Sequence, residues 1–267
     1  VLATTLGFCL ACLMGLVLGL IGSGGSMLTV PILVYLFDVN PFLATGYSLF
    51  VVGVTALVGV VSYWRRGLIR IKNTFLFVLP STMMVLMTRR YILPNLSDPL
   101  VQLEHFTVSK SLFIMVMFAL LMFSAGLMML KPYQVELAED KRAHPRVYPL
   151  YLVLGSGAVG FFAGLVGAGG GFLIIPVLVM LFHLSMKEAI GTSLAVIMVN
   201  SLIGFQGDLF AGISINWYIL GPFLGLSIIG MLIGSFLNQY VDSYKLKRLF
   251  GYFMLFLAAI ILYVELW

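Results

Sequence analysis

Long apolar runs alternate with short polar connections along the whole chain. The runs cover residues 2–37, 41–63, 74–88, 111–130, 149–182, 189–206, 217–240 and 249–267. A bilayer hydrocarbon core about 30 Å thick needs roughly 20 apolar residues for each helical crossing, and most runs have about this length. The pattern therefore predicts an all-α polytopic membrane protein.

The first and fifth runs are longer than one crossing, and both are interrupted by glycines. The interruptions read GSGGS at residues 22–26 and GAGGG at residues 167–171. Clustered glycines disfavour a continuous helix by up to about 1 kcal/mol each relative to alanine, so each helix should stop and restart. The restarted arms are about a dozen residues long, too short to span the bilayer. The chain either kinks and continues through the membrane or turns back as a helical hairpin.

These two stretches belong to a duplicated unit. At an offset of 145 positions, residues 15–67 align without a gap on residues 160–212, and 21 of the 53 pairs are identical. Shared apolar composition would match leucines and valines, but it would not place glycines, a proline and a serine in register. Self-similarity at a fixed offset is the sign of an internal repeat.

The charges of the loops favour the hairpins. If the chain continues through both breaks, the 15 Lys and Arg residues divide into eight and seven. If both breaks turn back, twelve lie on the side of the central polar linker, and only Arg89, Arg90 and Lys110 lie opposite. Cytoplasmic loops carry an excess of Lys and Arg. We therefore expect hairpins, with both termini extracytoplasmic and the linker in the cytoplasm.

Hairpins would give each half five membrane-inserted segments, namely one re-entrant hairpin and three transmembrane helices. Because five is odd, the two halves would have opposite orientations, as in the inverted repeats of many secondary transporters. The expected division is a first repeat over residues 1–130, a cytoplasmic linker over 131–148 and a second repeat over 149–267.

Composition supports a membrane protein and excludes other classes. The chain is 61% hydrophobic and 9% charged, whereas soluble domains are about a quarter charged. The net charge is +5, and the basic residues lie in short loops. In such loops they determine the membrane topology and do not indicate nucleic-acid binding. Cys9 and Cys12 lack the further ligands of a metal site, and the three histidines show no ligand spacing. We expect neither a metal nor a cofactor.

The glycine breaks are the candidate substrate site. Glycine allows close approach of the backbone to a ligand, and the arms that restart at Ser26 and Gly171 would direct helix N-termini at a common place near the midplane, which favours a small anion. The alternative role, helix packing, predicts glycines four apart, which fits Gly15 with Gly19 and Gly160 with Gly164. The candidate backbone contacts are Gly22, Ser23, Gly24, Gly25, Ser26, Gly167, Gly169, Gly170 and Gly171.

The helix after each break adds polar side chains. Ser48 and Thr55 are seven apart and share a helix face, and their repeat mates are Ser193 and Asn200. Thr192 is a weaker candidate on the adjoining face. The alternative role for each is a hydrogen bond to a neighbouring helix backbone. Asp and Glu are expected only near segment ends, which argues against proton coupling through a buried carboxylate.

A family resemblance adds a substrate. The doubled GxxGxGGxxxxxP pattern, followed by A-x-G-x-S-L at residues 44–49 and 189–194, resembles the TauE/SafE family of sulfite-exporter-like permeases. The first copy departs from the family pattern, with Tyr47 for the usual Thr and Ser26 for Gly. The resemblance implies a secondary transporter that moves sulfite, thiosulfate or an organosulfonate across the cytoplasmic membrane, and it assigns no coupling ion.

Two other functions stay open at this point. One is a passive anion channel, and the other is a permease for a different small anion. A membrane enzyme is disfavoured because the sequence shows no nucleophile–base pair or metal cluster.

Overall fold

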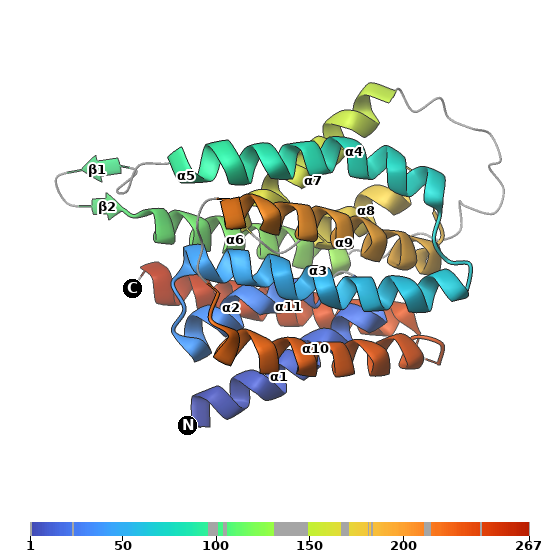
Figure 1. The fold of residues 1–267 in the computed structure, drawn as a ribbon, viewed down its shortest axis with the longest axis horizontal. Coiled ribbons are helices and arrows are strands. Elements are labelled where there is room, and N and C mark those ends of the chain that lie inside the picture. Colours follow the sequence, from blue (N-terminus) through green and yellow to red (C-terminus); the bar gives the residue numbers. More distant parts are fainter. Residues whose placement is uncertain are drawn as a thin grey trace.

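The computed structural model is a bundle of long helices (Figure 1). It describes residues 2–22, 24–95, 101–103, 106–130, 149–166, 171–180, 182, 184–210, 215–240 and 242–266. The first half contains α1 (Leu2–Ile21), α2 (Ser26–Phe37), α3 (Pro41–Arg65), α4 (Ile71–Met87), the π-helix η1 (Thr88–Ile92), α5 (Leu93–Asn95), the strands β1 (Val101–Leu103) and β2 (Phe106–Val108), and α6 (Lys110–Leu130). The second half contains α7 (Pro149–Val166), α8 (Gly171–Met180), α9 (Met186–Phe210), α10 (Trp217–Leu237) and α11 (Ser243–Leu266).

Local sequence explains where several helices begin. Asn40 caps α3 by accepting a hydrogen bond from the Phe42 backbone N–H, and Pro41 occupies the first helical position, where a missing N–H costs nothing. At the start of α9, Ser185 and Glu188 form a reciprocal capping box. These short polar motifs define the ends of the apolar segments.

The helices confirm an integral, multi-pass membrane protein. Within the described residues, six helices are long and apolar enough to cross a bilayer. Large hydrophobic side chains also remain exposed on the outside of the bundle, including Phe75 at 65% and Leu79 at 70%. Such a surface suits a hydrocarbon environment, because soluble proteins rarely expose contiguous apolar patches of this kind.

The first glycine break is a hairpin. The rings of Phe8 near the start of α1 and Phe37 at the end of α2 lie with centroids 5.0 Å apart, so the chain has reversed its direction between them. Gly22 takes the left-handed conformation, with φ of +79°, which side chains disfavour. A Cβ atom on Gly25 would lie less than 3.0 Å from the backbone of α1. The prediction of a hairpin is therefore confirmed for α1 and α2.

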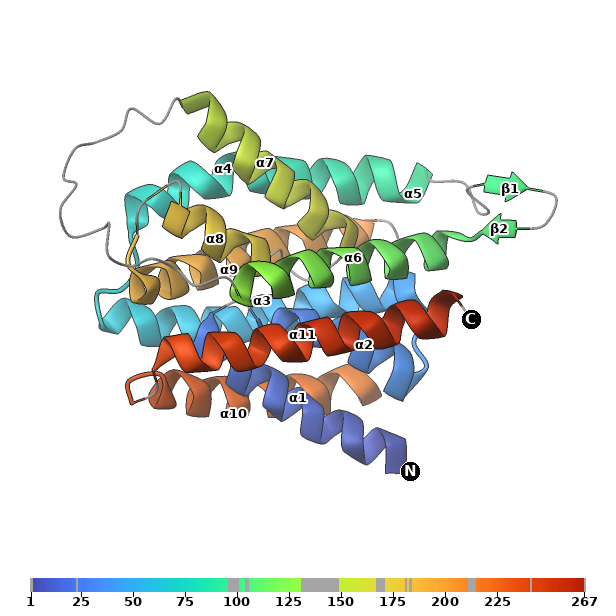
Figure 2. The same ribbon diagram turned by 180° about the vertical axis from the view of Figure 1, so that it is seen from behind.

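The two halves interlock. Helix α10 of the second half packs on α1 and α3, and α4 of the first half packs on α7 and α9. The bundle thus contains an α3 group, made of α1, α2, α3 and α10, and an α9 group, made of α7, α8, α9 and α4. The main contact between the groups is that of α3 with α9. Helices α6 and α11 pack against each other on one side of the bundle (Figure 2).

Three segments differ from the sequence-based expectation. The apolar run at 74–88 continues as helix through Asn95, and the run at 189–206 continues to Phe210. Arg89 and Asp208, which were expected in or near loops, therefore lie within helices. The third difference is a short antiparallel ribbon of β1 and β2 between α5 and α6, which the hydrophobic pattern did not indicate.

Candidate functional site

The end of α1 lies inside the bundle, where other helices satisfy its carbonyl groups. The last carbonyls of a helix have no partner within it. Here Tyr63 Oη donates to the Gly19 carbonyl at 2.7 Å, Asn238 Nδ2 donates to that of Leu20 at 2.6 Å, and Ser193 Oγ donates to that of Gly22 at 3.1 Å. Side chains from three elements thus hold the break in place.

The restart of this hairpin leaves a helix N-terminus in the interior. Residues Gly24, Gly25 and Ser26 are all buried, and Gly25, at the N-cap position, provides no side-chain hydrogen bond to α2. The N–H groups and the positive dipole end of a helix favour anions. The geometry of this turn is therefore suited to the small anion that the sequence indicates.

The second break is only partly described. Ser23 of the first break, and Gly167, Gly169 and Gly170 of the second, lie outside the described residues. Gly171 is the buried first residue of α8, and α2 and α8 are in contact. Gly22 lies against Ile190 on the second turn of α9. Whether the two breaks meet near the midplane stays a prediction.

The polar candidates on α3 and α9 differ in their bonding, although they are repeat mates. Ser193 donates to backbone carbonyls, and Asn200 is bonded to Ser81 and Thr82 of α4. Ser48 and Thr55 are fully buried, and their hydroxyl groups have no hydrogen-bond partner. A buried hydroxyl without a partner costs roughly 1–3 kcal/mol. On α3, two polar groups are thus left available for a ligand.

Thr192 and its repeat mate Tyr47 have equivalent contacts. Thr192 Oγ1 accepts a hydrogen bond from the Arg70 backbone N–H at 3.1 Å, and Tyr47 Oη accepts one from the Asn216 backbone N–H at 2.9 Å. Both hold the loop that precedes the fourth long helix of a repeat. The departure of Tyr47 from the family pattern therefore preserves a structural contact.

The sequence reasoning missed a buried ion pair. The side chain of Arg89 in η1 is 0% exposed and that of Asp208 in α9 is 2% exposed. Arg89 Nη1 donates to Asp208 Oδ2 at 3.1 Å and to Thr45 Oγ1 of α3 at 3.0 Å. An ionisable group within a membrane helix indicates a functional site. The expectation that Arg89 lies in a loop is wrong, because it lies in the helix η1.

The internal repeat held a signal for Asp208 but not for its partner. The alignment runs on to Gly212, so a helix that ends at Arg65 in the first copy predicts one that ends near residue 210 in the second. Asp208 then falls in the last turn of a helix. Arg89 carried no comparable signal, because the alignment stops before α4.

Helices α4 and α9 are joined at three levels by polar side chains. The segment before α4 contributes Arg70, which forms an ion pair with Glu188 at the start of α9. Thr82 contacts Asn200 in the middle, and Arg89 contacts Asp208 at the far end. The three sequence separations are 118, 118 and 119 residues. The near-constant separation shows that the two helices run parallel and side by side.

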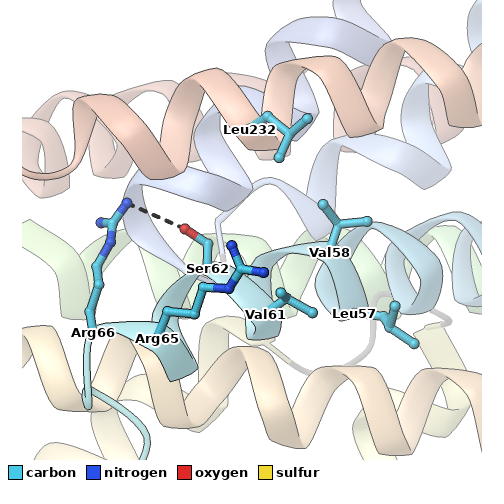
Figure 3. Close-up of a pocket in the computed structure, with 7 residues that line it drawn as sticks. All are labelled: Leu57, Val58, Val61, Ser62, Arg65, Arg66 and Leu232. Atoms are coloured by element: carbon cyan, nitrogen blue, oxygen red, sulfur yellow. Dashed lines mark hydrogen bonds between the residues drawn. The ribbon is translucent and has the colours of Figure 1, made fainter.

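A groove between α3 and α10 has a different chemistry. It encloses about 470 Å³, and its lining comprises Leu57, Val58, Val61, Ser62, Arg65, Arg66 and Leu232 (Figure 3). Most of this lining is aliphatic, and the side chains of Leu57, Val61 and Leu232 are between 44% and 52% exposed. Arg66 Nη2 donates to Ser62 Oγ at 3.3 Å at one end. This open groove thus combines an aliphatic lining with the polar side chains of Ser62, Arg65 and Arg66.

The sequence from residue 7 to residue 261 matches the family described as "Sulfite exporter TauE/SafE". The chain belongs to the TauE/SafE family. The match covers both repeats, so it includes both glycine breaks and the Arg89–Asp208 pair.

Relatives of this TauE/SafE protein are named as transporters. A "Probable membrane transporter protein" of Xylella fastidiosa (strain Temecula1) is 30% identical over 94% of this chain and 91% of its own length. "Probable membrane transporter protein YunE" of Bacillus subtilis is 25% identical over 89% of this chain and 91% of its own. No solved structure matches. The family and these relatives indicate that the chain is a membrane transporter.

Proposed function

We propose that this permease moves a small sulfur oxyanion, such as sulfite, thiosulfate or an organosulfonate, across the cytoplasmic membrane. The proposal combines the chemistry of the hairpin turn with the substrate that the family description names. The turn offers backbone N–H groups and a helix dipole, both of which favour a negative charge. Ser48 and Thr55 add two hydroxyl groups that have no partner among the described residues.

The transport cycle would use alternating access between two inverted repeats. In Figure 1, α1, α3 and α6 run from left to right, whereas their counterparts α7, α9 and α11 run from right to left. Opposed directions are what inverted repeats with an odd number of inserted segments require. In this arrangement both termini are extracytoplasmic, and the linker at residues 131–148 is cytoplasmic.

The interlocked packing suggests which parts move. Because α4 and α10 each pack on the other repeat, the rigid units would be the α3 group and the α9 group, and not the two repeats as sequence segments. The polar contacts between these groups include those of Ser193 with the Gly22 carbonyl and of Arg89 with Thr45. The Ser193 contact lies near the start of α9, and the Arg89 contact lies beside Asp208 near its end. When the groups rock, one of these contacts can therefore break while the other is kept.

The observation that carries the proposal is the buried hairpin turn. Irregular backbone at membrane depth occurs only where protein buries it or where it lines an aqueous cavity. Three side chains bond to the carbonyls of Gly19, Leu20 and Gly22 at the end of α1, and Gly25, the N-cap residue of α2, provides no side-chain cap.

The test is uptake of labelled thiosulfate and sulfite into proteoliposomes, with other sulfur oxyanions as unlabelled competitors. We expect saturable uptake that the competitors inhibit. A Gly24→Val variant should insert normally yet lose uptake, because its side chain fills the turn, whereas Gly157→Ala on α7 should behave like the unaltered protein. Flux that does not saturate would indicate a passive channel, and normal uptake by Gly24→Val would remove the turn from the site.

A further inference from the structure

We infer that Arg89 is the cationic group that binds the transported anion, and that Asp208 and Thr45 hold its guanidinium in position. The inference rests on the proposed function and adds to it a specific charged group, which lies beside the end of α9 opposite to the one that contacts Gly22.

One edge of the guanidinium is bonded and the other is free. Nη1 is shared between Asp208 and Thr45. The Nε and Nη2 atoms are buried and have no hydrogen-bond partner. These two nitrogens lie on the same edge of the planar group, and a pair of N–H donors on one edge matches two oxygens of an oxyanion. The bonded nitrogen thus orients Arg89, and the free edge has the geometry for a bidentate anion.

A purely structural role does not explain why Arg89 and Asp208 are charged residues. Burial of an ion pair costs several kcal/mol per ion before the attraction between the ions offsets it, and replacement by neutral groups is often stabilising. The structure contains such a neutral contact at the corresponding end of α3 and α10, where Ser62 Oγ donates to Ser235 Oγ at 3.3 Å. Asp208 is the repeat mate of Tyr63, next to Ser62. Equivalent helices are therefore joined without charge in the other half of the bundle.

A second free polar group lies on α3, about one helical turn from Thr45. Thr45, which contacts the guanidinium, and Ser48 are three residues apart, so they share one face of the helix. The Ser48 hydroxyl is buried and has no partner. Arg89 and Ser48 thus bring three N–H donors and one O–H donor to one end of the contact between the α3 group and the α9 group. Several donors around one position are typical of an oxyanion site.

The place of Arg89 in the fold provides a route of access. Its free nitrogens are buried, so an anion reaches them only after the helices move. Arg89 lies in η1, which continues α4 of the α9 group, and Thr45 belongs to the α3 group. In the proposed motion, separation of the groups breaks the Nη1–Thr45 bond and makes room for an anion beside the guanidinium. Arg89 also lies in a π-helix, η1, and π-helical turns are frequent at functional sites.

The test uses a charge-neutral double variant, Arg89→Gln with Asp208→Asn, in the full-length protein. A single Arg89→Gln change would leave Asp208 buried and unpaired, which destabilises by about 3–5 kcal/mol. The double variant retains a hydrogen-bonding amide on each helix, so it should keep the elution profile and the thermal midpoint of the unaltered protein. The matched control is Arg70→Gln with Glu188→Gln, which neutralises the ion pair at the other end of the same two helices.

The readouts are binding of thiosulfate to the purified protein by calorimetry and its uptake into proteoliposomes. We expect the Arg89/Asp208 variant to fold but to bind at least about tenfold more weakly, as the loss of charge-assisted hydrogen bonds implies, whereas the Arg70/Glu188 variant binds normally. Arg89→Lys, which keeps the charge but loses the two-donor edge, should bind with intermediate affinity.

The outcomes separate this inference from the proposed function. If the unaltered protein and the folded Arg89/Asp208 variant bind and transport thiosulfate equally well, the inference is wrong and the proposed function stands. If the unaltered protein takes up no sulfur oxyanion, the substrate assignment fails, and binding is repeated with sulfate, phosphate and acetate. If the unaltered protein binds an anion from this panel and the double variant does not, the role of Arg89 in anion binding is supported. If both proteins bind every anion equally, that role is contradicted.

Discussion

At the scale of single residues, repeat mates have acquired different roles. Ser48 and Ser193 occupy the same position in the two copies, and both are fully buried. Ser193 donates to the carbonyl of Gly22 and so stabilises the end of α1, whereas the Ser48 hydroxyl has no partner. The duplication supplied equivalent positions, and the neighbours of each position decided its use.

This difference predicts opposite effects of one substitution. Ser193→Ala should lower the free energy of unfolding by about 1–2 kcal/mol, because it leaves a buried carbonyl without its side-chain donor. Ser48→Ala removes a group that has no bond to lose, so it should leave the thermal midpoint unchanged or higher while it raises the KM for the anion several-fold. The measurements are thermal midpoints in detergent and uptake kinetics. A midpoint that falls equally in both variants would show that the Ser48 hydroxyl is also structural.

At the scale of elements, small residues set how closely the helices approach. The glycines spaced four apart on α1 and α7 lie at helix contacts, as their spacing predicts. A Cβ atom on Gly15 or Gly19 would come within 3.0 Å of the backbone of α10, and one on Gly160 within 3.0 Å of the backbone of α4. Close backbone approach at small residues is the usual basis of helix association in membranes.

Two glycines on α7 allow a controlled test of this packing. Gly160→Ala should destabilise the protein by about 1–3 kcal/mol, because the added methyl group meets the backbone of Ser81 and the helices must separate. Gly157→Ala is the matched control, since no atom lies within 4 Å of a Cβ at that position, and its thermal midpoint should be unchanged or higher. Equal midpoints for the two variants would contradict the packing of α7 on α4.

At the scale of the whole molecule, the interlocked repeats make each half depend on the other. Helix α4 finds its main partners, α7 and α9, in the second half, and α10 finds α1 and α3 in the first. Each half alone would expose the faces that these helices cover. The protein is therefore one folding unit, although its sequence divides clearly into two.

Expression of the halves as separate chains tests this dependence. Residues 1–130 and 149–267 should each fail to yield a stable, monodisperse protein when expressed alone. When expressed together they should copurify, because the contacts of α4 with α7 and of α1 with α10 need no covalent link between the halves. A single half that remains folded and monodisperse on its own would contradict the interlocked arrangement.

The sequence by itself determined most of the local structure. Apolar runs specified the long helices because each crossing needs about 20 apolar residues, and clustered glycines specified where the first helix stops because they disfavour helix within a few residues. The duplication identified equivalent positions such as Ser48 and Ser193. The polar side chains on α3 and α9 were recognisable from spacing alone, since seven residues make nearly two helical turns.

Tertiary structure decided which of these groups are bonded, buried or free. The Arg89–Asp208 contact depends on the parallel register of α4 and α9, two helices separated by 119 residues in the chain, and no local preference encodes that register. The exchange of α4 and α10 between the repeats also arises only from packing in three dimensions. Propensities act over a few residues, whereas the partner of a buried charge is set by which helices pack together, and this is why the ion pair was visible only in the folded protein.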